Sequence, residues 1–118
     1  MNITVSRDKV ADLSAKLRKL GIRPDAARRH ARKVLEAKAL MWKNLVEIRF
    51  FRKDGQLVTK VATMNPAFLP EGKHDIRQND DPRVVTFWSV QDDGYRCFLA
   101  ENFVSVVGLR NIRQLAVA

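Results

Sequence analysis

The spacing of apolar residues changes near residue 45, and this change restricts the fold more than any other feature of the sequence. Before that point apolar side chains recur every three or four residues, as on one face of an α-helix. After it they alternate with polar side chains, as in a β-strand with one buried face. A chain of 118 residues has room for one core. The sequence therefore predicts an α+β fold in which helices precede a sheet.

Two helices are predicted in residues 1–43, which form a basic helical segment. Ser6 is a suitable N-cap for the first helix, and Gly21 fits the left-handed position that ends it. Pro24 can open the second helix, which we expect to end near residue 42 or 43. We interpret Trp42 as a core plug between helix and sheet. The predicted inward faces carry Val10, Leu13, Leu17 and Leu20, then Ala27, Ala31, Val34, Leu35, Lys38, Met41 and Trp42.

The alternating runs VEIRFF and LVTKVAT flank Asp54 and Gly55, a pattern typical of a β-hairpin. A two-residue loop would place Ile48 opposite Val61, and Arg49 directly opposite Lys60. Like charges in that position destabilise a sheet unless a carboxylate screens them or an anion binds there. A three-residue loop with a bulge would change this register.

Three further strands are predicted from RVVTFWSV, YRCFLA and FVSVVG. The proline-rich residues 64–82 between the two hairpins are predicted to be a long loop. Five short strands are too few for a sandwich and favour a small, partly open barrel. We therefore expect two N-terminal helices followed by a five-stranded SH3-like (Sm-like) β-barrel over residues 44–109, with 110–118 as a tail.

Residue types with catalytic or metal-binding chemistry are few and scattered. Cys97 lies in a strand-like segment and is expected to be a small buried group, and His30 and His74 are expected at the surface. No nucleophile–base pair, phosphate-binding loop or metal-ligand spacing is present. We therefore expect no enzymatic activity, no catalytic residue, no metal and no cofactor.

Positive charge is concentrated in the first third of the chain. The net charge is +9, and residues 1–43 hold twelve of the 22 Lys and Arg but only four of the 13 Asp and Glu. Such an excess indicates a nucleic acid, an acidic protein partner or a solvated helix face, and we favour nucleic acid. The predicted phosphate contacts are Arg28, Arg29, Arg32 and Lys33, helped by Lys16, Arg18 and Lys19.

A second nucleic-acid surface is conceivable on the predicted strands. It would use Arg49, Lys60 and Arg96 for phosphates, with Phe51 or Trp88 as a ring on which a base stacks. In the alternative interpretation Trp88 belongs to the core and the cations pair with nearby carboxylates. Both interpretations stay open at the level of sequence.

The segments FFRKDGQLVTKVATMNP, VVTFWSV and YRCFLAENFVSV carry a resemblance to a known family. The charged DG hairpin, the Asn65-Pro66 step, the aromatic strand and the Arg96-x-Phe98 pair are its main motifs. Over about residues 45–107 the chain resembles the small Sm-like SH3 β-barrels of the WYL-like type, which occur in bacteriophages and some bacteria.

The resemblance implies functions as well as a fold. In the wider family such domains sense ligands or bind nucleic acid, and an Arg-x-Phe-Arg segment contributes a binding arginine, which Arg96 matches. Leu99 occupies the position of the second arginine in that Arg-x-Phe-Arg segment. The family's Trp-Tyr-Leu motif is replaced here by Phe87-Trp88-Ser89. Sm-like barrels also bind RNA or assemble as rings, which adds a homo-oligomer to the expected partners. A phage inhibitor of a host factor, or a virion component, docking on an acidic protein surface remains an alternative.

The location of the protein is expected to be cytoplasmic, in a bacterial or infected host cell. The first residues, MNITVSRDK, lack the apolar core of a signal peptide, and no apolar run approaches membrane-spanning length. We therefore expect no membrane partner.

Overall fold

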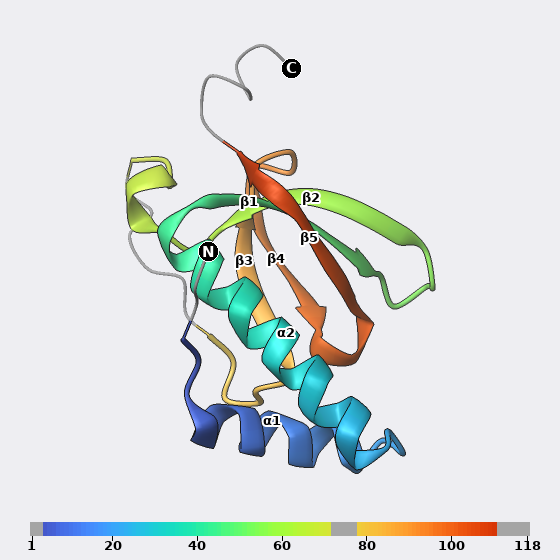
Figure 1. Cartoon of the computed structure of the whole chain (residues 1–118). Helices are drawn as coiled ribbons and strands as arrows, with labels where there is room; N and C mark the ends of the chain where they lie inside the picture. Colours follow the sequence, from blue (N-terminus) through green and yellow to red (C-terminus); the bar gives the residue numbers. More distant parts are fainter. Residues whose placement is uncertain (1–3, 72–77, 111–118) are drawn as a thin grey trace.

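The computed structural model describes residues 4–71 and 78–110, and it confirms the predicted α+β fold. Its five strands form one antiparallel sheet in the order β4-β3-β2-β1-β5. Figure 1 shows α2 lying across the strands, with α1 below them beside the start of α2. The elements are α1 (Arg7–Arg18), α2 (Pro24–Lys43), β1 (Leu45–Phe51), β2 (Leu57–Thr63), the 3-10 turn η1 (Pro66–Phe68), β3 (Val84–Ser89), β4 (Gly94–Leu99), the 3-10 turn η2 (Ala100–Asn102) and β5 (Phe103–Arg110).

The helices begin and end at the predicted residues. The Ser6 hydroxyl accepts a hydrogen bond from the Lys9 backbone N–H at 3.4 Å, which satisfies one of the free donors of the first turn. Gly21 has φ +95°, the left-handed conformation that ends a helix at low steric cost. Pro24 is the first residue of α2. Leu20 lies beyond the end of α1 and is 48% exposed, so it is not part of the buried stripe.

The sheet curls around a cluster of aromatic side chains. Phe98 from β4 stacks on Phe103 from β5 and on Phe50 from β1, with ring centroids 5.3 Å and 5.2 Å apart. Phe87 from β3 completes the cluster, with its ring centroid 6.0 Å from that of Phe98 and 5.9 Å from that of Phe50. The single turn η2 joins the two edge strands β4 and β5. This arrangement is the predicted small SH3-like barrel.

The first hairpin has a register one residue away from the two-residue-loop prediction. Arg52 donates its backbone N–H to the Gln56 carbonyl at 2.9 Å, and three residues, 53–55, form the loop. Gly55 has φ +86°, as the last residue of a three-residue loop with a bulge requires. Because the register is shifted, Arg49 opposes Thr59, and Lys60 opposes Ile48. The two cations are therefore not directly opposed, and that prediction was wrong.

The end of α2 is hydrogen-bonded to the end of β2. The Met41 carbonyl accepts hydrogen bonds from the Thr63 hydroxyl at 3.2 Å and from the Met64 backbone N–H at 2.8 Å. The Asn65 side chain donates to the Lys43 carbonyl at 3.2 Å and accepts from the Ala67 backbone N–H. The last carbonyls of a helix have no partner within it, and these contacts satisfy two of them. This is the structural role of the Asn65-Pro66 step.

Three single-residue expectations are corrected by the structure. His30 is half-buried and its Nε2 lies 2.6 Å from the Ala100 carbonyl, so it joins α2 to η2 and is not a free surface residue. Trp42 is 44% exposed and is not a core plug, and Cys97 is exposed on β4. His74 and the tail residues 111–118 lie outside the described residues.

Candidate nucleic-acid interface

Three arginines converge in the groove between the two helices. Arg7 from the first turn of α1, with Arg28 and Arg32 from α2, lines a cavity of about 380 Å³. Arg28 and Arg32 are four residues apart, so their side chains lie one above the other on one helix face. Asp8 is the acidic side chain among the lining residues. The groove therefore holds three cations and one carboxylate, an arrangement that attracts an anion.

Arg29 and Lys33 lie on the exposed side of α2. Arg29 forms the predicted pair with Asp25 at 3.5 Å, in which the two side chains are 73% and 65% exposed. An ion pair with this exposure stabilises weakly, so it holds Arg29 only loosely. Lys33 has no ion pair within 4 Å to any residue in the described ranges, and its charge is free to meet a ligand.

Lys16 is separated from this groove. It lies nine residues from Arg7, about 180° around the helix, and so on the opposite flank of α1. There its charge contributes to a lowered pKa of Asp81, for which the hydrogen bond from the Arg83 backbone N–H is the main cause. Lys16 therefore faces the loop before β3, away from Arg28 and Arg32.

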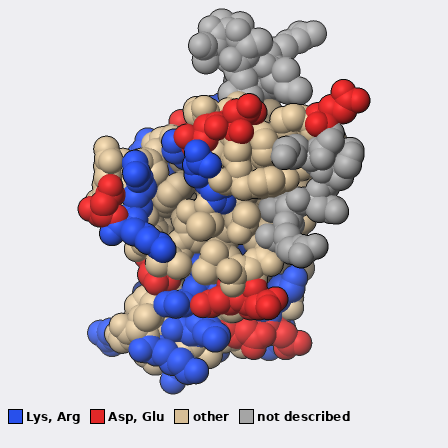
Figure 2. Space-filling model, turned by 180° about the vertical axis from the view of Figure 1, so that it is seen from behind, with Lys and Arg blue, Asp and Glu red and all other residues tan. Residues whose placement is uncertain are grey.

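Arg18 and Lys19 lie at the C-terminal end of α1, where a cation interacts favourably with the helix dipole. Neither lines the arginine groove. Figure 2 shows the molecule from behind, with Lys and Arg side chains gathered at the end that carries the helices and Asp and Glu side chains beside them. The helical end is thus a basic surface interrupted by carboxylates, and the predicted contacts fall into separate groups on it.

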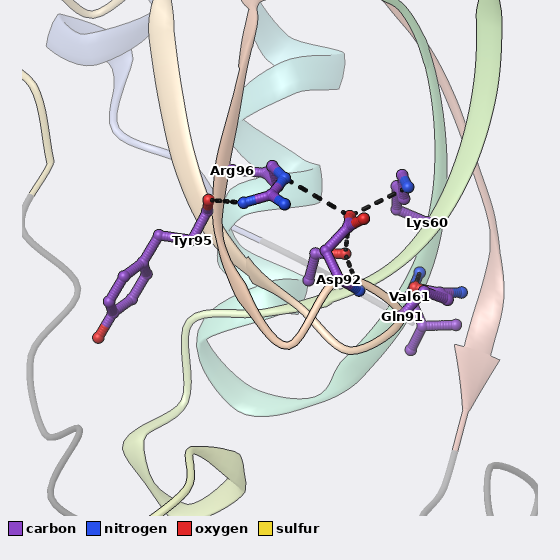
Figure 3. A network of polar contacts seen from close by, with 7 residues as sticks. Lys60, Val61, Gln91, Asp92, Tyr95 and Arg96 are labelled. Atoms are coloured by element: carbon purple, nitrogen blue, oxygen red, sulfur yellow. Dashed lines mark hydrogen bonds and ion pairs between the residues drawn. The ribbon is translucent and has the colours of Figure 1, made fainter.

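On the strands, the structure brings Lys60 and Arg96 together around one carboxylate (Figure 3). Asp92 Oδ2 lies 3.0 Å from Lys60 Nζ and 3.7 Å from Arg96 Nε. It also accepts a hydrogen bond of 2.7 Å from the Ser89 hydroxyl. The Ser89 hydrogen bond, followed by that from Lys60, lowers the pKa of Asp92. The two predicted phosphate contacts are therefore already engaged by an internal anion.

Arg52 is a cation that the sequence analysis did not select. It shares a cavity of about 320 Å³ with Lys60 and Arg96, and it also lines a second cavity of about 400 Å³ beside β4. Phe50 and Cys97 line both cavities. Arg52 lies two residues beyond Phe50, and this period-of-two spacing, visible in the sequence, places both side chains on the same side of the strand.

Arg49 stands apart from the other strand cations. It is exposed, donates to the Thr59 hydroxyl at 3.3 Å and does not line the cavity that Lys60 and Arg96 share. The three strand cations therefore do not form one surface.

Trp88 belongs to the core. Its side chain is 6% exposed and packs edge-to-face against Tyr95, with ring centroids 5.0 Å apart. A buried ring offers no face to a base, so the prediction of a stacking role for Trp88 was wrong. Phe51, the alternative ring, is 43% exposed and is paired across the hairpin with Leu57.

Trp42 is an exposed aromatic side chain that the sequence analysis misassigned. It follows Arg28 by fourteen residues, which places it within about 40° of Arg28 around α2. A helical projection therefore puts it on the flank that carries the arginines, at the edge of the apolar stripe. The helical projection alone could have predicted that Trp42 is exposed. The core interpretation rested instead on the apolar character of tryptophan.

The part of the chain that the structure describes contains neither a grouping of metal ligands nor a membrane-spanning helix. Within residues 4–71 and 78–110, no three His, Cys, Asp or Glu side chains are grouped as metal ligands would be. No helix in the same ranges combines the length and the hydropathy needed to cross a membrane.

The curled five-stranded sheet, its aromatic core and the helix docked on it define a small SH3-like barrel. The WYL_2 family model, described as an Sm-like SH3 beta-barrel fold, matches residues 34–104. This is more than half of the chain, so the protein belongs to that family, as the resemblance predicted. The match begins inside α2 and so includes the part of the helix that is hydrogen-bonded to β2. Comparisons with curated proteins and with solved structures found no match.

Proposed function

We propose that this protein binds nucleic acid through phosphate contacts made by the exposed flank of α2 and the first turn of α1. The observation that carries the proposal is the convergence of Arg7, Arg28 and Arg32 on one groove that contains a single carboxylate. Guanidinium groups match phosphate geometry and bind it through two parallel hydrogen bonds. Arg29 and Lys33 extend the contact along α2, and Arg18 and Lys19 add charge near its start.

The contacts proposed here are to the backbone, with little sequence selectivity. Side chains that read bases must reach the edges of base pairs in a groove. The arginines of this groove are exposed side chains, and the sequence carries no motif typical of an element that enters a DNA groove and reads bases. The strand cations Lys60 and Arg96 contribute less, because Asp92 already neutralises part of their charge.

The test compares two double variants with the same change in net charge. Arg28→Glu/Arg32→Glu alters the groove, and Arg52→Glu/Lys53→Glu alters the exposed tip of the β1–β2 hairpin. Binding to single- and double-stranded DNA and RNA is measured by fluorescence anisotropy across a salt series. Each lost phosphate contact lowers the slope of log K against log salt by about 0.9 for duplex DNA. We expect the slope to fall by about two in the groove variant, as the loss of two phosphate contacts predicts, and to change little in the hairpin variant.

An equal decrease of the salt slope in the two variants would show that binding depends only on net charge. The groove would then not be the binding site. Absence of binding by the unaltered protein at roughly 50 mM salt, where electrostatic binding is strong, would reject the proposed function as a whole.

Docking on an acidic protein is a second candidate, favoured by a different observation. Phe51 and Leu57, paired across the first hairpin, are 43% and 47% exposed, and Arg52 follows directly. Protein interfaces are enriched in aromatic and arginine side chains with this arrangement. The hairpin variant Arg52→Glu/Lys53→Glu tests this candidate. A partner that docks on the hairpin should no longer bind this variant but should still bind the groove variant.

A further inference from the structure

A third cavity surrounds the exposed tryptophan of α2. Its volume is about 390 Å³, within the range of about 300–1,000 Å³ common for ligand pockets. Trp42 forms an aromatic wall that is 44% exposed. The cavity is built from three parts of the chain that are distant in sequence, and its lining residues are Thr4, Val5, Ser6, Lys9, Leu35, Lys38, Ala39, Trp42 and Gln78.

Two ammonium groups from different helices face this cavity. Lys9 belongs to α1 and Lys38 to α2, and neither has an ion pair within 4 Å to a residue in the described ranges. Burial lowers the pKa of Lys38, and the nearby charge of Lys9 lowers it further. An anion located between the two amines would oppose both effects, so the geometry favours a negatively charged group beside the indole ring.

We propose that this cavity holds one nucleotide of a single-stranded nucleic acid, with its base stacked on Trp42 and its phosphate between Lys9 and Lys38. The proposal rests on the nucleic-acid binding proposed above and adds the class of substrate. An aromatic face stacks any base, and adjacent cations hold the backbone, which is how single strands are bound without sequence preference. A base within a duplex is already stacked on both faces and has none to offer.

The arginine groove and this cavity lie on the same flank of α2. Arg32 and Trp42 are ten residues apart, about 15 Å along the helix axis. The cavities are bounded by opposite flanks of α1: Arg7 borders the groove, and Lys9, about 200° further around the helix, borders the tryptophan cavity. The two cavities are therefore separate sites, and a strand bound in the tryptophan cavity would have to cross α1 to reach the arginines.

Tryptophan fluorescence gives a direct test, because the chain has two tryptophans and Trp88 is buried. A short oligothymidylate should quench the emission of Trp42, whereas a duplex of the same length should not. Trp42→Phe should retain most of the affinity and lose the quenching. Trp42→Ala should weaken oligothymidylate binding about tenfold or more, the effect of one lost base–aromatic stack, and leave duplex binding unchanged.

A matched control is Leu20→Ala, which removes another exposed apolar side chain from the helical segment. This substitution should change neither the affinity for oligothymidylate nor the affinity for the duplex. Lys38→Gln should reduce the salt dependence of oligothymidylate binding by about 0.7 in slope, as one lost phosphate contact on a single strand does.

The outcomes separate this inference from the proposed function. Binding that requires Arg28 and Arg32 but is unaffected by Trp42→Ala would overturn the inference alone. Absence of any binding by the unaltered protein would overturn both. Quenching by thymidine monophosphate at the same concentration as the oligomer would overturn the strand proposal and identify a mononucleotide pocket. If Trp42→Ala fails to fold, the quenching of the unaltered protein decides, and its absence overturns the inference.

Discussion

Asp92 is one carboxylate that contacts both strand cations. It lies in the turn between β3 and β4, where the Ser89 hydroxyl and Lys60 orient it and Arg96 lies near it. Lys60 points to the core face of β2, opposite the buried Ile48, and its ammonium group reaches out of the barrel to this carboxylate. Without Asp92, the ammonium group of Lys60 would lie half-buried with no opposite charge.

Replacing Asp92 by Asn should lower the free energy of unfolding near pH 7 by about 1–2 kcal/mol, through a charged hydrogen bond and a partly exposed ion pair. Because the pKa of Asp92 is lowered in the folded state, its contribution is present above the unfolded value of about 3.9. It is lost as the pH falls through the folded pKa. The difference between protein and variant should therefore shrink in acid, as measured by urea unfolding at several pH values.

The neighbouring substitution Asp93→Asn is the matched control. Asp93 has φ +49°, which Asn also tolerates, and no ion pair within 4 Å joins it to a described residue. If both variants lose the same stability with the same pH dependence, the contacts of Asp92 are not the cause.

At the scale of elements, the β1–β2 hairpin has the largest effect on the candidate site. Its three-residue loop shifts the register by one, which turns Lys60 to the barrel side and leaves Arg49 on the outside. A one-residue shift moves every side chain of a strand to the opposite face. Arg52, which directly follows β1 and lies two residues beyond Phe50, lines the two cavities beside β4 together with Phe50.

Gly55 is the residue on which this loop depends. A Cβ added there would contact nothing within 4 Å, but φ is +86°, which disfavours residues with a side chain. Gly55→Ala should therefore destabilise the protein by about 1–2 kcal/mol. Gly55→Asn should cost less, since Asn adopts left-handed conformations more readily. Equal effects in urea unfolding would mean that the backbone conformation of this residue is not what the loop requires.

For the whole molecule, the helices and the barrel share one core. A single cluster of buried residues extends from Val10 in α1 through Met41 in α2 to Phe103 in β5. The hydrogen bond between His30 and the Ala100 carbonyl, and those from the end of β2 to Met41, join the same parts. Removing the helices would expose the apolar side chains that they cover.

We therefore expect the helices and the barrel to unfold together. In the Trp42→Phe variant, fluorescence reports only Trp88 in the barrel, while circular dichroism at the helical band reports α1 and α2. The two urea transitions should have the same midpoint, as in a two-state domain. Two separated midpoints would show that the helical segment is an independent unit.

Local signals were sufficient for the elements and the family. Ser6, Gly21 and Pro24 specify helix ends because each acts through its own backbone or its nearest neighbours. The alternating runs and Asp54-Gly55 identified the first hairpin for the same reason. The basic flank of α2 also follows from helical spacing alone, so Arg28, Arg32 and Lys33 could be selected from the sequence.

The remaining features depend on contacts between distant residues. The burial of Trp88 and the exposure of Trp42 depend on which face each element presents to the core, and both residues are equally apolar in the sequence. The engagement of Lys60 by Asp92 joins residues 32 positions apart, and the contact of His30 with Ala100 joins residues 70 apart. Tertiary packing decided these features, because such contacts form only when the strands have paired into the curled sheet and α2 has docked on it.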